Sequence, residues 1–289
     1  MIWRRNAPAA RLRFVNPVRP VLLGAFAVLL AAAAGTGWFV LCGPMAEAAA
    51  ETLPLPPDVP RLASGPEYQR CLAMLRQDPE NARNFAETWE AAGGGEGARH
   101  CGALALLAVG EPERAAERLE QLARASQGST ATRASVYAQA VQAWMMAGDG
   151  NRAFGAATLA LTLTPDDPDL LLDRAVALGT LGRYAEALED VNRVIALDAN
   201  RAEAWVFRAA ANRHQDRVDQ AAEDVAHALA LTPDNAEALL ERGIIRQLQG
   251  DTAGAKDDWE RTIVLAPNTA TADLAQQNLA LNEAGPQRR

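Results

Sequence analysis

Residues 168–201 read PDLLLDRAVALGTLGRYAEALEDVNRVIALDANR, and the next two stretches of equal length follow the same pattern. They are AEAWVFRAAANRHQDRVDQAAEDVAHALALTPDN at 202–235 and AEALLERGIIRQLQGDTAGAKDDWERTIVLAPNT at 236–269. A fourth window, 134–167, precedes them, so residues 134–269 divide into four windows of 34 residues. A fixed period of this length predicts a stack of helix–turn–helix units.

The windows agree position by position. Small residues recur at position 20, where two helices must cross closely: Ala153, Ala187, Ala221 and Ala255. Position 8 is also small in most windows, with Val141, Ala175, Ala209 and Gly243. Position 24 is predicted to fill the space between helices, with Ala157, Val191, Val225 and Trp259. Position 32 ends the second helix, with Pro165, Ala199, Pro233 and Pro267.

These positions, together with Gly148, Gly182 and Gly250 at the inter-helix turn, resemble the tetratricopeptide repeat (TPR) family. The resemblance implies an all-α solenoid, a right-handed superhelix of antiparallel helix pairs whose inner surface is lined by the first helices. TPR domains are usually adaptors or chaperone-like scaffolds, but the fold alone does not choose a ligand.

Residues 66–133 are predicted to be irregular, TPR-like helices near 66–77, 82–92, 96–109 and 112–125. The last two are similar to a degenerate repeat, and the first pair is expected to cap the stack. At the other end, residues 270–284 resemble a capping helix, with Leu274, Leu279 and Leu281 available to cover the last repeat.

The N-terminus is organised differently. Residues 1–20 are basic, and residues 21–41 contain no charge and could form a helix of roughly 31 Å, enough to span a bilayer. Five arginines precede this segment, which places the repeats on the far side of the membrane under the positive-inside rule. Residues 49–65 are a proline-rich linker.

Two alternatives stay open for residues 21–41. One is an uncleaved signal anchor in a bacterial inner membrane, with the repeats facing the periplasm. The other is a signal peptide cleaved near Ala48, which would leave a periplasmic protein. The uncharged run is longer than the usual core of a signal peptide, which favours the anchor.

Cys71 and Cys101 lie 30 residues apart, as do the starts of their predicted helices. In a stack of helix pairs, first helices of adjacent units run side by side, so the two thiols would lie at the same height. An exported domain would allow a disulfide, whereas the alternative is a pair of buried, reduced cysteines.

Composition argues against several classes of function. Residues 49–289 hold 23 basic and 35 acidic residues, a net charge of −12, which leaves no electrostatic basis for binding nucleic acid. The three histidines, His100, His214 and His227, show no metal-ligand spacing. No nucleophile or phosphate-binding motif is present, so we expect neither an enzyme, nor a metal site, nor a cofactor.

By the TPR resemblance, positions 2, 5, 9, 12 and 13 face an inner groove. The groove candidates are Gln142, Met145, Met146, Leu172, Val176, Val206, Arg213, Leu240, Ile244 and Gln247. Position 2 adds an acidic rim with Asp169, Glu203 and Glu237. Arg213 is the only inward cation, which argues against the carboxylate clamp of chaperone-binding TPR domains. The groove suits a peptide with hydrophobic anchors and basic residues.

The sequence therefore predicts a non-catalytic scaffold that binds a protein or peptide in its groove, on the exported side of a membrane. The alternatives are a periplasmic assembly chaperone and a self-associating structural protein. Membrane contact is expected through residues 21–41 if they are not cleaved.

Overall fold

The computed structural model describes residues 62–284, and within that range the chain folds into thirteen α-helices and no strands. The helices are α1 (Pro66–Gln77), α2 (Pro79–Ala91), α3 (Gly95–Ala108), α4 (Pro112–Ala125), α5 (Thr130–Ala147), α6 (Gly150–Leu163), α7 (Pro168–Thr180), α8 (Tyr184–Leu197), α9 (Ala202–His214), α10 (Val218–Leu231), α11 (Ala236–Leu248), α12 (Thr252–Leu265) and α13 (Ala270–Ala284). The basic segment, the uncharged segment 21–41 and nearly all of the linker lie outside the described residues.

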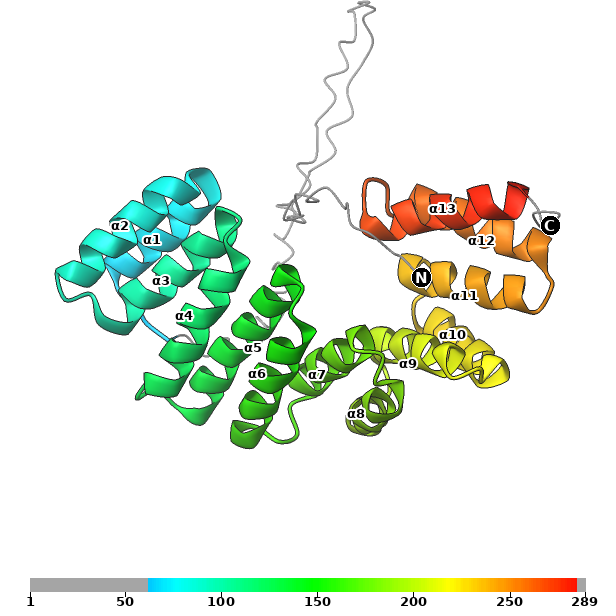
Figure 1. Ribbon diagram of the computed structural model, residues 1–289, viewed down its shortest axis with the longest axis horizontal. Helices are drawn as coiled ribbons and strands as arrows, with labels where there is room; N and C mark the ends of the chain where they lie inside the picture. Colours follow the sequence, from blue (N-terminus) through cyan, green and yellow to red (C-terminus); the bar gives the residue numbers. More distant parts are fainter. Residues whose placement is uncertain (1–61, 285–289) are drawn as a thin grey trace, which may run out of the picture. The chain divides into compact units, whose positions relative to one another are not determined.

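Each helix packs on the next in chain order (Figure 1). The first helices of neighbouring pairs also touch one another, as in α5 with α7, α7 with α9 and α9 with α11. Each 34-residue window thus supplies two helices, with one difference in the first window, where α5 begins four residues early at Thr130. Likewise α2 begins at Pro79 rather than near residue 82, because proline fits the first turn of a helix.

The turn between the two helices of a unit requires a left-handed backbone. Gly148, Gly182 and Gly250 have φ of 78°, 72° and 87°, which glycine adopts at low cost. Asp216 occupies the same position in the third repeat with φ of 59°. The recurring glycine therefore follows from turn geometry.

The core sits between the two helices of each unit and between adjacent units. The four alanines at position 20 are completely buried, as expected for a close crossing. The fourth repeat has the largest side chain at position 24, the buried Trp259, and a glycine at the facing position 8, Gly243. A Cβ on Gly243 would lie 2.7 Å from Cδ1 and 2.9 Å from Cε2 of that indole. Here a missing side chain makes room for a large one.

Candidate functional site

Helices α5, α7 and α9 present side chains that are incompletely buried. Gln142 and Met146 of α5 are exposed, the methionine by 44%. Met145, Leu172 and Val206 are half-buried, with one side packed on the core. Val176 of α7 is half-buried too. With Asp173 and Phe207 these residues form a mixed surface, called here the first-helix face: Gln142, Met145, Met146, Leu172, Asp173, Val176, Val206 and Phe207.

On α11 the predicted face is closed at Leu240. Leu240 is only 9% exposed and belongs to a cluster with Trp259 and Ala275. Ile244 and Leu279 pack against that cluster, and Ala275 and Leu279 lie on α13. Leu240 therefore does not line an open groove, because α13 covers it, whereas Ile244 is half-buried. Gln247, at the end of α11, is half-buried.

Helix α13 covers the last repeat with only part of its apolar surface. Ala272 and Ala275 are buried, whereas Leu274 and Leu281 are 49% and 68% exposed. Of its three leucines, only Leu279 packs on the last repeat.

Arg213 is not a free cation. Its Nε donates to Glu241 Oε1 at 2.5 Å and its Nη2 to Oε2 at 3.2 Å, which links α9 to α11. The neighbouring His214 stacks on Tyr184, with ring centroids 4.4 Å apart. Burial and then the positive charge of Arg213 lower the pKa of His214. The predicted inward cation thus holds two helices together.

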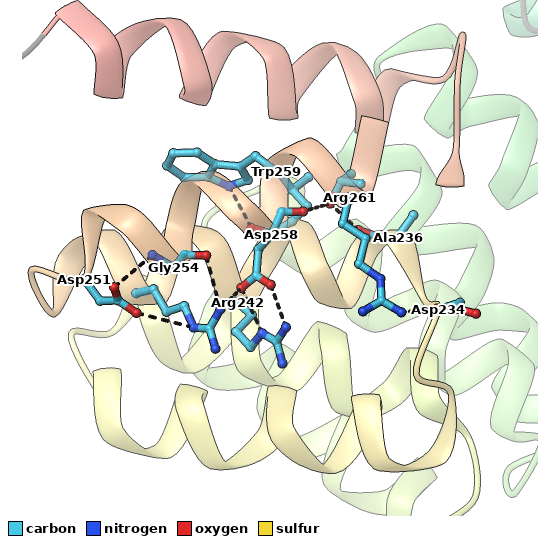
Figure 2. A network of polar contacts seen from close by, with 11 residues as sticks. Asp234, Ala236, Arg242, Asp251, Gly254, Asp258, Trp259 and Arg261 are labelled. Atoms are coloured by element: carbon cyan, nitrogen blue, oxygen red, sulfur yellow. Dashed lines mark hydrogen bonds and ion pairs between the residues drawn. The ribbon is translucent and has the colours of Figure 1, made fainter. Parts of the chain in front are cut away.

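Buried ion pairs recur with the period of the sequence. Arg174–Asp190, Arg208–Asp224 and Arg242–Asp258 join the first and second helices of three successive units, with N···O distances of 2.5 to 2.6 Å. Figure 2 shows the last of these pairs, Arg242 with Asp258. Arg246 also donates to Asp258. These pairs were not predicted from the sequence, although an arginine at position 7 and an aspartate at position 23 recur in the printed windows.

Asp173 is the contrasting carboxylate. It is half-buried on α7, and no hydrogen bond or ion pair reaches it within the described residues. Burial, followed by the Asp169 and Asp167 carboxylates, raises the pKa of Asp173 to about 7. The sequence predicted an acidic rim at position 2 but did not single out this residue at position 6.

The N-terminal helices carry a second polar feature. His100 is 5% exposed, and Nδ1 lies 2.6 Å from the Tyr68 hydroxyl of α1. Its Nε2 lies 2.6 Å from Oε1 of Gln139 on α5. Burial lowers the pKa of His100, with a smaller opposing effect from Gln139. These contacts tie α1, α3 and α5 together along their first-helix side.

Beside His100, the Sγ atoms of Cys71 and Cys101 lie 1.99 Å apart as a disulfide, with their Cα atoms 6.3 Å apart. The bond joins α1 to α3, which are adjacent first helices. Tyr68, Ala86, Phe85 and Trp89 surround it in a small apolar cluster.

Two polar clefts lie elsewhere in the described region. A polar cleft of about 490 Å³ is lined by α8, α9 and α10 and includes the Arg208–Asp224 pair. Another, of about 350 Å³, adjoins Trp144 and the α5–α6 turn. Residues 62–284 contain no group of three or more His, Cys, Asp or Glu side chains that could hold a metal ion. In the same range no helix has the length and apolarity to cross a membrane.

Comparison with known proteins supports the repeat architecture. Residues 172–236 match the family model described as tetratricopeptide repeat. No curated protein matches the chain. Among solved structures, the APC/C hetero-tetramer Cut9–Hcn1 gives a TM-score of 0.56 at 17% identity, covering 74% of this chain and 42% of that one.

A thermophilic TPR protein of Thermus thermophilus gives a TM-score of 0.53 at 16% identity, covering 64% of this chain and 100% of that one. The MamA RS-1 ArsTM double mutant gives 0.48 at 18% identity, covering 70% and 96%. The two structures with TM-scores above 0.5 show the fold alone, because their identities are this low. The described part is therefore an all-α array of TPR-like helix pairs, with TPR sequence in residues 172–236.

Proposed function

We propose that this protein is a non-catalytic scaffold whose first-helix face binds a segment of another protein. TPR arrays generally serve as protein-interaction scaffolds, and stacked repeats create extended surfaces for that purpose. The observation that carries the proposal is the half-open apolar surface of α5, α7 and α9. Met145, Met146, Leu172 and Val206 keep part of their apolar area in solvent although each helix is otherwise well packed. Methionine adapts to varied partners because its side chain is flexible and polarisable.

We further propose that the repeats act in an oxidising, exported compartment. The basic residues 1–20, the uncharged segment 21–41 and the Cys71–Cys101 disulfide support this placement. Export through an uncleaved anchor would hold the array at the membrane, and cleavage near Ala48 would release it.

The test is selection of random peptides on the immobilised full chain, followed by affinity measurement on charge-carrying variants. Met146→Lys places a charge on the first-helix face. Leu159→Lys on α6 is the matched control, because Leu159 is 42% exposed and Met146 44%. We expect Met146→Lys to weaken selected peptides about tenfold or more and Leu159→Lys to leave them unchanged. Peptides that bind both variants equally well would place binding elsewhere.

A further inference from the structure

Buried carboxylates of the repeats are held by arginine. Asp190, Asp224, Glu241 and Asp258 are each at most 6% exposed, and each accepts bonds from an arginine side chain. Removing a carboxylate from water is costly unless a cation or donors replace the water. Asp173 is half-buried rather than buried, and no such partner reaches it within the described residues.

No cation of residues 130–214 reaches Asp173 at hydrogen-bond or ion-pair distance. Residues 130–214 contain no lysine. Each arginine of that stretch already has a carboxylate or carbonyl partner: Arg133 with Ala123, Arg152 with Glu117, Arg174 with Asp190, Arg183 with Glu186, Arg193 with Asp166, Arg201 with Asp169, Arg208 with Asp224 and Arg213 with Glu241. The one histidine there, His214, stacks on Tyr184.

The repeat register explains why the partner is missing. Position 12 of one first helix lies against position 6 of the next, as Arg213 on α9 does with Glu241 on α11. One repeat earlier, a Cβ on Gly179 of α7 would lie 3.0 Å from Cζ of Phe207 on α9. The same register one repeat further back predicts that Met145 of α5 lies against Asp173 of α7. In this register a methionine takes the position that Arg213 has in its pair with Glu241.

We propose that Asp173 receives a lysine or arginine side chain of the protein segment that binds the first-helix face. This inference rests on the proposed function and specifies its ligand. Met145, Leu172 and Val176 would contact the aliphatic stem of that side chain, since long cationic residues commonly lay their methylenes on apolar surface. Asp169 in the preceding turn of α7 is paired with Arg201, which leaves Asp173 as the carboxylate available to a basic segment.

The pH dependence of the affinity provides a second test of this binding, because Asp173 ionises near neutral pH. With a pKa of about 7, the free carboxyl is mostly protonated at pH 6 and mostly ionised at pH 8. A cation binds only the ionised form, so affinity should rise about tenfold between these pH values. Asp173→Asn removes the dependence, and binding should release a proton near pH 7.

The experiment uses peptides selected on the full chain, as above, and reads their sequences and affinities. We expect enrichment of Lys or Arg at one position, and about tenfold weaker binding both to Asp173→Asn and after replacing that residue by Gln in the peptide. The two changes together should cost no more than either alone. Asp257→Asn, at an exposed position of α12, is the matched control and should bind normally.

Peptides that lose affinity on Met146→Lys but bind wild type and Asp173→Asn equally would overturn the cation subsite and leave the binding face intact. Peptides indifferent to both changes would overturn the face itself. Circular dichroism of each variant verifies that the fold is unchanged.

Discussion

At the residue scale, ionisation of the half-buried Asp173 costs folding stability. Its pKa is about 7 in the folded chain against an ordinary value of 3.8, so the folded state holds the proton over the pH range between them. In that window the folded state binds more protons than the unfolded state, and the free energy of unfolding falls as pH rises.

We expect Asp173→Asn to raise the free energy of unfolding at pH 8 by roughly 1–2 kcal/mol, discounted for partial exposure, and to change it little at pH 4. Urea unfolding of variant and wild type at both pH values measures this. Burial lowers the pKa of His100, so this residue makes the free energy of unfolding rise with pH below about pH 6.5. The difference between variant and wild type is unaffected, because both proteins contain His100. Equal stabilities at pH 8 would show that Asp173 is well solvated.

A second residue-scale prediction concerns the periodic ion pairs. Asp224→Ala leaves Arg208 without its carboxylate and should cost about 3 kcal/mol in the free energy of unfolding. Arg208→Ala with Asp224→Ala should recover much of that loss. The first repeat supports this, because Ala140 and Ala156 occupy the equivalent positions and are fully buried. Additive losses in a double-mutant cycle would contradict a coupled pair.

At the element scale, the helices of each unit pack by complementary size. Gly243→Ala should destabilise the protein by about 1–3 kcal/mol, since its Cβ meets the indole of Trp259. Adding Trp259→Val should restore part of the loss, because the third repeat has alanine and valine at the same two positions, Ala209 and Val225. Thermal unfolding measures both variants, and an unchanged melting temperature for Gly243→Ala would show that the two helices can separate freely.

The disulfide is also an element-scale feature, because it joins α1 to α3. Closing a loop between residues 30 apart contributes about 3–4 kcal/mol in the chain-entropy model. The double variant Cys71→Ser/Cys101→Ser should therefore raise the rate of amide hydrogen exchange in α1 and α2 far more than in α9 and α10. The reason is that each repeat of an array is stabilised mainly by its direct neighbours. Thiol labelling of both cysteines in the native protein without reductant would contradict the bond.

Much of this element-scale arrangement follows from the sequence alone. The repeat period placed the helix pairs, the alanine crossings and the turn glycines, because each depends on local spacing and backbone geometry. The period could not show that Glu241 neutralises Arg213 or that α13 covers Leu240, since both depend on packing between non-consecutive helices. Asp173 was overlooked because its distinguishing property is the absence of a partner.

At the scale of the whole molecule, residues 49–289 carry a net charge of −12, and the first-helix face concentrates apolar side chains next to unpaired acid. A basic, amphipathic segment complements both properties. Alternatives predict different contacts. A holdase would bind many unfolded chains. A self-associating protein would leave other proteins unbound, and the exposed Leu274 and Leu281 of α13 offer a surface for such self-association.

The most direct test is site-specific photo-crosslinking in cells that produce the full chain. A photoreactive amino acid replaces Gln142 or Met146 on the first-helix face and, as a control, Leu159 on α6. We predict discrete crosslinked proteins at the two face positions, none at Leu159, and their loss on adding Asp173→Asn. Crosslinks equally strong at all three positions, or only to a second copy of this chain, would contradict a partner-binding first-helix face.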